Sequence, residues 1–119
     1  MHRIRYVNLS VKDKNLKKAY LNSLNKIFNH GIFILGPEVD QLEKKLANFC
    51  NRKYAVATGS GTDALYLAIK SLDLKQNDEI ITTPMSWVSS TNAISLNNVK
   101  PVFVDVKDDL NIDVNKIEK

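Results

Sequence analysis

Residues 58–62 form a short run of glycines and hydroxyl side chains between an apolar run and an expected helix. Gly59 and Gly61 let the backbone turn tightly and approach a ligand closely. The first N–H groups of a helix that begins near Thr62 have no partner inside that helix, and with the helix dipole they favour a phosphate. Ser60 and Thr62 add hydroxyl donors. A plain turn with a helix cap fits the same spacing equally well.

The same residues also match G-x-G-x-x-A over positions 59–64, the fingerprint of dinucleotide-binding folds. Such a fold needs an acidic residue about 20 positions further on, at the carboxyl end of the second strand. Asp78 and Glu79 lie at the beginning of that strand, which argues against NAD without excluding it. We expect Asp63 to face away from the loop, because a carboxylate aimed into it would repel a phosphate.

Trp87 lies just past the end of the next expected strand. An aromatic side chain in that place can stack on a planar ligand ring, more strongly if the ring is cationic. An isolated tryptophan is otherwise a core or interface anchor. A phosphate-binding loop and an aromatic side chain at adjacent strand ends suit a phosphorylated heteroaromatic cofactor.

The elements that must position these residues follow from apolar periodicity. Two amphipathic helices come first, and Gly31 and Pro37 mark the end of one and the start of the other. Strands then alternate with helices, which is typical of a parallel α/β sheet. The expected strands are 54–58, 79–83 and 101–105, and the expected helices are 10–30, 37–49, 62–72, 86–96 and one that begins at Asp113.

Composition narrows the possible classes of protein. The chain has 119 residues and a scattered net charge of +4, which fits one domain or a piece of one and no nucleic-acid-binding arm. We expect no membrane segment, no signal peptide and no metal site. Cys50, the single cysteine, is expected to pack as a small core hydrophobe, and one cysteine fits a reducing cytoplasm.

Three strands and their helices make an incomplete three-layer sheet with mainly parallel strands and an exposed edge. The sequence also stops at Lys119, where a helix is expected to start. We therefore interpret the chain as truncated, with a helical segment over residues 1–50 and the first part of an α/β domain over 51–119. A complete small domain is the alternative.

The ordered motifs resemble those of the DegT-type sugar aminotransferases, a branch of the fold type I pyridoxal-phosphate enzymes. Each motif alone is common, but the ordered set is specific and covers nearly the whole chain. The resemblance implies that these residues are the N-terminal part of the large domain of such an enzyme. The motifs are residues 34–39, 58–65, 78–84, 86–89 and 101–105.

The resemblance also implies roles for single residues. Gly61 and Thr62 match positions that bind the phosphate of pyridoxal 5'-phosphate, and Trp87 matches the aromatic residue stacked on its pyridine ring. A further match concerns the region that approaches the sugar nucleotide. Its residues are Tyr6, Gly31, Ile32, Phe33 and Ile34.

The implied reaction moves an amino group from an amino acid, usually glutamate, to a keto group of a nucleotide-linked sugar, for amino sugars in polysaccharides. The family's enzymes are homodimers with active sites at the interface. Their Schiff-base lysine, and the aspartate that pairs with the pyridine nitrogen, match no residue of this chain, so no catalytic residue is assigned and the chain alone is not expected to transaminate. A sugar dehydratase of the same family and a non-catalytic phosphate-binding remnant remain alternatives.

Overall fold

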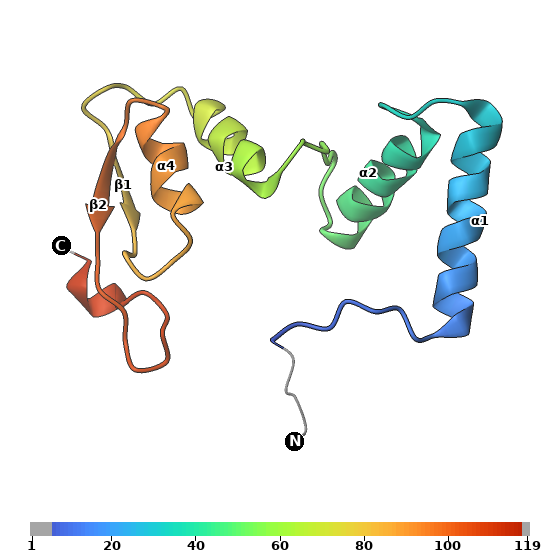
Figure 1. Ribbon diagram of the computed structural model, residues 1–119. Helices are drawn as coiled ribbons and strands as arrows, with labels where there is room; N and C mark the ends of the chain where they lie inside the picture. The colour runs from blue at the N-terminus through green and yellow to red at the C-terminus, as the bar shows by residue number, and fades with distance from the viewer. Residues whose placement is uncertain (1–5, 118–119) are drawn as a thin grey trace, which may run out of the picture. The chain divides into compact units, whose positions relative to one another are not determined.

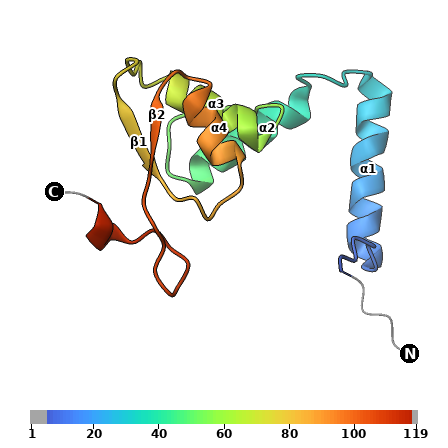
Figure 2. The same cartoon turned by 60° about the vertical axis from the view of Figure 1, so that its left-hand side comes forward.

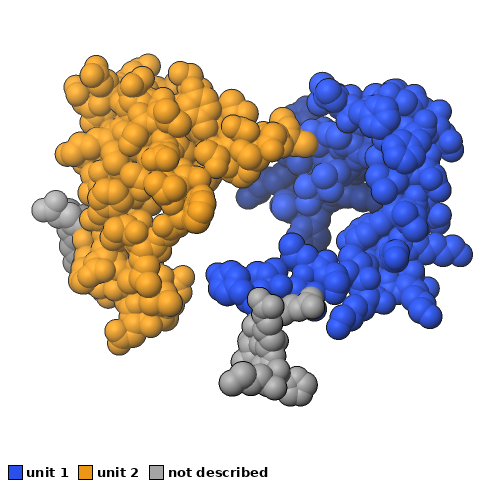
Figure 3. Space-filling view, in the orientation of Figure 1, with its two compact units in different colours: residues 1–55 blue, residues 56–119 orange. Residues whose placement is uncertain are grey.

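A computed structural model describes residues 6–117 of the chain, and it divides into two compact units, residues 1–55 and 56–119 (Figure 3). The placement of a domain boundary between residues 50 and 51 stays a prediction. None of the helices in the described part is both long and apolar enough to cross a bilayer.

The first unit contains two helices, α1 (Lys14–His30) and α2 (Pro37–Phe49) (Figure 1). The Asp13 side chain accepts hydrogen bonds from the Asn15 and Leu16 amides in the first turn of α1. The helix therefore begins at residue 14 and not at residue 10. Gly31 ends α1 with a left-handed φ of 69°, as its glycine predicts. Both helices therefore have the ends that their local sequence favours.

The apolar faces of these two helices are largely exposed. No residue of α1 is buried, and Leu24 in the middle of its apolar stripe is 46% exposed. Ala47 is the only buried residue of α2. Cys50 is also exposed, so the expectation that it packs in a core is wrong. Cys50 is exposed because the apolar face of α2 beside it is covered only around Ala47.

The second unit is a small α/β assembly. Its elements in chain order are α3 (Gly61–Lys70), β1 (Glu79–Thr82), α4 (Ser89–Ser95), β2 (Lys100–Phe103) and the 3-10 helix η1 (Val114–Lys116). The two strands pair in parallel, from Glu79 opposite Lys100 to Thr82 opposite Phe103. Helix α4 packs on both strands and on α3, and its Ala93 and Ile94 are buried. The expected α/β class with parallel strands is confirmed.

Two expected elements differ from the structure. Residues 54–58 form no strand, because a strand needs a continuous ladder with a neighbour and the sheet of the described residues consists of β1 and β2. The sheet therefore has two strands in the described part of the chain, where three were expected. The helix expected from Asp113 is only the single 3-10 turn η1, capped by the Asp113 side chain.

The second unit has a defined polarity. Both strands end on the side of the unit where α3 and α4 begin, as two views show (Figures 1 and 2). This is the end of an open parallel sheet at which ligands bind. The loop at residues 58–62 and the segment from residue 83 to residue 88 both lie there, because they lead into α3 and α4.

Candidate functional site

The loop before α3 is shaped by its own hydroxyl groups. Ser60 is extended, with φ of −159° and ψ of 167°, and its Oγ accepts a hydrogen bond from the Asp63 amide at 3.1 Å. The Thr58 hydroxyl donates to the Ser60 carbonyl at 2.9 Å. These local bonds fix where the first residue of α3 lies.

Asp63 does not face away from the loop, contrary to expectation. Its Oδ2 accepts a hydrogen bond from Ser60 Oγ at 2.9 Å, and a Cβ on Gly59 would lie 3.1 Å from the same atom. Ser60 thus caps the helix through the Asp63 amide, and its hydroxyl proton holds the Asp63 carboxylate beside the cap. The Ser60 hydroxyl is engaged with Asp63 as both donor and acceptor, so it is not a spare donor for a ligand.

The amides of Gly61 and Thr62 are the first two of α3 and remain available. No hydrogen bond found among the described residues uses either amide. A Cβ on Gly61 would meet nothing within 4 Å, so the space beside this glycine is open. Amides at the start of a helix, next to open space, form a site suited to a phosphate or another anion.

The Thr62 side chain connects this site to α4. Its Oγ1 donates to Ser89 Oγ at 2.9 Å, across 27 positions in the sequence. Ser89 is half-buried and is the first residue of α4. Sequence reasoning did not single it out as a site residue, although it belongs to the motif at 86–89. Only its spatial contact with Thr62 distinguishes it from the neighbouring serines.

Trp87 precedes Ser89 by two positions and exposes 77% of its surface. Its carbonyl accepts a hydrogen bond from the Ser90 amide at 3.0 Å, which holds the backbone at the start of α4. The indole is therefore not a core anchor of the described chain. An exposed aromatic ring at the carboxyl end of the sheet is free to stack on a ligand.

The residues expected near a sugar nucleotide lie in the first unit and are not brought together within it. Tyr6 belongs to the segment before α1, whereas residues 31–34 follow its other end (Figures 1 and 2). Tyr6 and Ile34 are both highly exposed. The Phe28 and Phe33 rings lie 6.2 Å apart between centroids, which attaches the segment loosely to α1.

His30 orders the turn that carries residues 31–34. Its Nδ1 accepts a hydrogen bond from the Ile32 amide at 3.0 Å, and its Nε2 lies 3.3 Å from Glu38 Oε1 at the start of α2. The backbone N–H of Glu38 is the largest cause that lowers the pKa of the Glu38 carboxyl, and His30 lowers it further. The turn between the two helices is thereby held at both ends.

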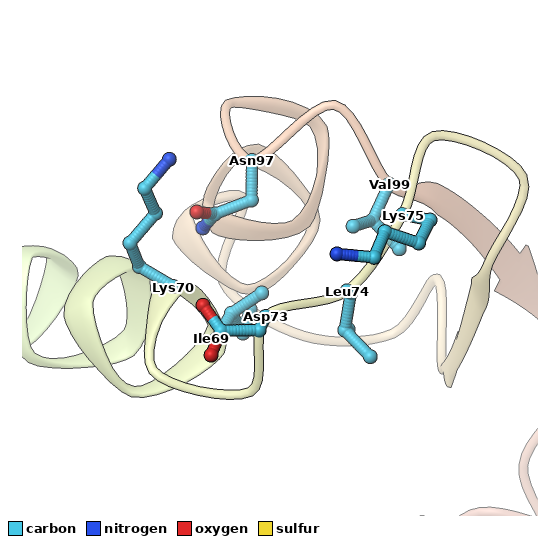
Figure 4. A pocket seen from close by; sticks show the side chains of 7 residues that line it. All are labelled: Ile69, Lys70, Asp73, Leu74, Lys75, Asn97 and Val99. Carbon is cyan, nitrogen blue, oxygen red and sulfur yellow. The ribbon is translucent and has the colours of Figure 1, made fainter.

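A separate hollow of about 120 Å³ lies at the opposite ends of α3 and α4 (Figure 4). Asn97 lines it, and its Nδ2 donates to the carbonyls of Tyr66 at 3.0 Å and Ala93 at 2.8 Å. This side chain ties the two helices together far from Gly61 and Thr62. The hollow is thus not the anion site that the sequence predicts. Its lining is Ile69, Lys70, Asp73, Leu74, Lys75, Asn97 and Val99.

Known proteins resemble this arrangement over most of the chain. Residues 14–119 match the DegT/DnrJ/EryC1/StrS aminotransferase family. The dTDP-3-amino-3,6-dideoxy-alpha-D-galactopyranose transaminase of Aneurinibacillus thermoaerophilus is 35% identical over 117 residues, which are 98% of this chain and 32% of that protein. The chain thus spans about a third of this curated relative.

Two solved structures extend the likeness to three dimensions. A DegT DnrJ EryC1 StrS aminotransferase from Brucella abortus has a TM-score of 0.85 and 25% identity, over 95% of this chain and 31% of that one. An E coli GDP-4-keto-6-deoxy-D-mannose-3-dehydratase with bound hydrated PLP has a TM-score of 0.79 and 30% identity. That likeness covers 96% of this chain and 30% of the dehydratase chain.

Proposed function

Because the chain belongs to the DegT/DnrJ/EryC1/StrS aminotransferase family, we propose that it forms the N-terminal part of a sugar aminotransferase dependent on pyridoxal 5'-phosphate. The observation that carries this proposal is the pair of available amides at Gly61 and Thr62. They lie in the motif that the family resemblance assigns to the cofactor phosphate, and a Cβ on Gly61 would meet nothing within 4 Å. In this proposal the enzyme transfers an amino group, with glutamate as donor, to a keto group of a nucleotide-linked sugar.

The residues present fit the cofactor. A phosphate needs several donors and no steric obstruction; the Gly61 and Thr62 amides are available donors, the space at Gly61 is open, and the Thr62 hydroxyl can add a donor by turning from Ser89. The exposed Trp87 indole offers a flat face for the pyridine ring. When bound, pyridoxal 5'-phosphate supplies an electron sink that stabilises charge at the amino carbon of a substrate.

This chain's own contribution is binding and orientation. The amides at the start of α3 hold a dianion without introducing a mobile side chain, and Trp87 fixes the plane of a ring. The Asp63 carboxylate competes for the same helix terminus, but its hydrogen bond to Ser60 keeps it at the cap. We assign no catalytic lysine among these residues, and we infer that the 119-residue chain alone does not transaminate.

The first unit would contribute to substrate recognition. Tyr6, Gly31 and the exposed apolar residues that follow Gly31 are the candidates for contacts with the sugar nucleotide. Their exposure leaves them accessible to a ligand or to a second subunit, in keeping with a homodimer of the complete protein. A cytoplasmic location belongs to the same proposal.

A sugar dehydratase is the second candidate, favoured by the likeness to the E coli dehydratase. The two reactions differ in their products. With a nucleotide-linked keto sugar and glutamate, an aminotransferase yields an amino sugar, whereas a dehydratase yields a sugar that has lost a hydroxyl group. Mass spectrometry of the product separates the two candidates.

The cofactor site is tested in the complete enzyme with Thr62→Ala plus Trp87→Ala. Equilibrium dialysis should show at least about tenfold weaker binding of pyridoxal 5'-phosphate, because a hydroxyl contact and a stacking face are lost together. Ser71→Ala is the matched control, because its hydroxyl bonds to the Ala68 carbonyl at the other end of α3. Unchanged affinity in the double variant would overturn the site assignment.

A further inference from the structure

Ser89 lies outside the loop at residues 58–62, and its hydroxyl contacts Thr62, a residue proposed to bind the cofactor phosphate. Its Oγ lies 2.9 Å from Thr62 Oγ1, and it has no other side-chain hydrogen bond among the described residues. Two neighbouring serines are occupied differently, since Ser86 Oγ and Ser90 Oγ lie 3.4 Å from each other. The contact with Thr62 is therefore specific to Ser89.

The direction of this hydrogen bond matters for the binding of a phosphate. Each hydroxyl group has one proton to donate and two lone pairs to accept, and it rotates to suit its partners. In the structure the Thr62 hydroxyl donates to Ser89. The oxygens of a phosphate dianion only accept, so Thr62 can donate to a phosphate only if its proton leaves Ser89.

Ser89 can reverse its role without moving its oxygen. If its own proton turns toward Thr62 Oγ1, Ser89 becomes the donor at the same separation of 2.9 Å, and the Thr62 proton becomes available. Ser60 cannot serve in this way, because Asp63 engages its hydroxyl as donor and as acceptor.

We propose that Ser89 is a positioning residue of the phosphate site, which donates to Thr62 Oγ1 and thereby directs the Thr62 proton at the bound phosphate. This inference rests on the proposed function, because it assumes a phosphorylated cofactor at α3. It adds a residue on α4 to a site otherwise formed by the start of α3. Ser89 on α4 then acts on the phosphate only through Thr62 on α3.

The test compares pyridoxal 5'-phosphate with pyridoxal, which lacks the phosphate, in the complete enzyme. Ser89→Ala should weaken binding of pyridoxal 5'-phosphate about three- to tenfold and change binding of pyridoxal less than about twofold, because one neutral hydrogen bond is lost. Ser89→Cys, which keeps the size with a weak donor, should act like alanine, and Ser89→Thr should restore wild-type binding. Ser90→Ala, equally half-buried on α4, is the matched control.

A double-mutant cycle with Thr62→Val shows whether Ser89 acts through Thr62. The expected result is that Ser89→Ala has no further effect once the Thr62 hydroxyl is gone. An equal effect of Ser89→Ala in both backgrounds, or an equal loss for both ligands, would overturn the inference. If Ser89→Ala fails to fold, Ser89→Cys replaces it, and its binding of pyridoxal 5'-phosphate and of pyridoxal is compared in the same two backgrounds.

The outcomes also separate this inference from the proposed function. A wild-type enzyme that binds pyridoxal as tightly as pyridoxal 5'-phosphate would refute the phosphate site itself. A wild-type preference for the phosphorylated ligand that survives Ser89→Ala unchanged would refute only the role of Ser89.

Discussion

The two glycines of the loop before α3 differ in their surroundings. A Cβ on Gly59 would lie 3.1 Å from the Asp63 carboxylate, so this glycine leaves room for the cap. A Cβ on Gly61 would meet no described atom within 4 Å. The packing of this chain therefore does not require a glycine at position 61, and a ligand that approaches the backbone closely would explain it.

This difference predicts opposite effects of Gly61→Ala on stability and binding. Stability of the fold should rise by about 0.5 kcal/mol, because alanine suits a helical position and restricts the unfolded chain. Affinity for pyridoxal 5'-phosphate should fall about tenfold, because the methyl group fills the space for the phosphate. Urea unfolding and equilibrium dialysis on the complete enzyme measure the two effects. Reduced stability together with unchanged affinity would contradict the phosphate site.

Single residues could be predicted where their partners are close in sequence. Gly31 and Pro37 mark two helix ends, and the structure has those ends. The start of α1 lies at residue 14 and not at the expected residue 10, because the Asp13 side chain caps the helix there. The orientation of Asp63 differs from the expectation, although its partner Ser60 is only three positions away, because the Ser60 hydroxyl donates to the Asp63 carboxylate. Ser89 could not be identified, because its contact with Thr62 spans 27 positions.

Strands depend on partners in a way that helices do not. A helix satisfies its backbone internally, so the periodicity of residues 61–70 was enough to predict α3. A strand needs a continuous ladder with a neighbour, and residues 54–58 have the apolar composition of a strand but lie outside the sheet of the described residues, which pairs β1 with β2. The parallel pairing of β1 with β2 could be predicted because a single crossover through α4 joins them.

The element η1 is held to the end of β2 by Asp105. Its Oδ1 accepts from the Val106 amide at 2.8 Å, and its Oδ2 lies 3.2 Å from Lys116 Nζ in η1. The Val106 amide and then Lys116 lower the pKa of the Asp105 carboxyl below its ordinary value of 3.8. The charged carboxylate is therefore the form that the folded segment favours.

The docking of η1 should depend on pH with a defined sign. Because the pKa is lowered in the folded state, the contribution is fully present above pH 3.8 and is lost as pH falls through the lower folded value. An NMR titration of the carboxyl carbon should place the Asp105 pKa below 3.8. Lys116→Met should raise it only part of the way, since the Val106 amide remains. A wild-type pKa at or above the ordinary value would contradict this account.

At the scale of the whole chain, little apolar surface is covered. Most large apolar side chains of α1 and those of residues 32–35 are exposed, as are Phe49, Trp87 and Phe103. The sequence predicted these amphipathic faces correctly but could not show what covers them, because their periodicity indicates only that a face is apolar. The buried hydrophobic residues of the described chain are Ala47, Ala93, Ile94, Val99 and Val104.

So much exposed apolar surface predicts that the 119-residue chain self-associates in isolation. Sedimentation velocity should show species heavier than the 13.5 kDa monomer, and their fraction should grow with concentration. Leu24→Lys, in the apolar stripe of α1, should weaken association about tenfold, because about 1.5 kcal/mol or more follows from burying a leucine side chain. Asn22→Lys adds the same charge to α1 without removing apolar surface, so it should leave association nearly unchanged. A wild-type chain that stays monomeric and unfolds in one cooperative transition would show that its apolar faces need no partner.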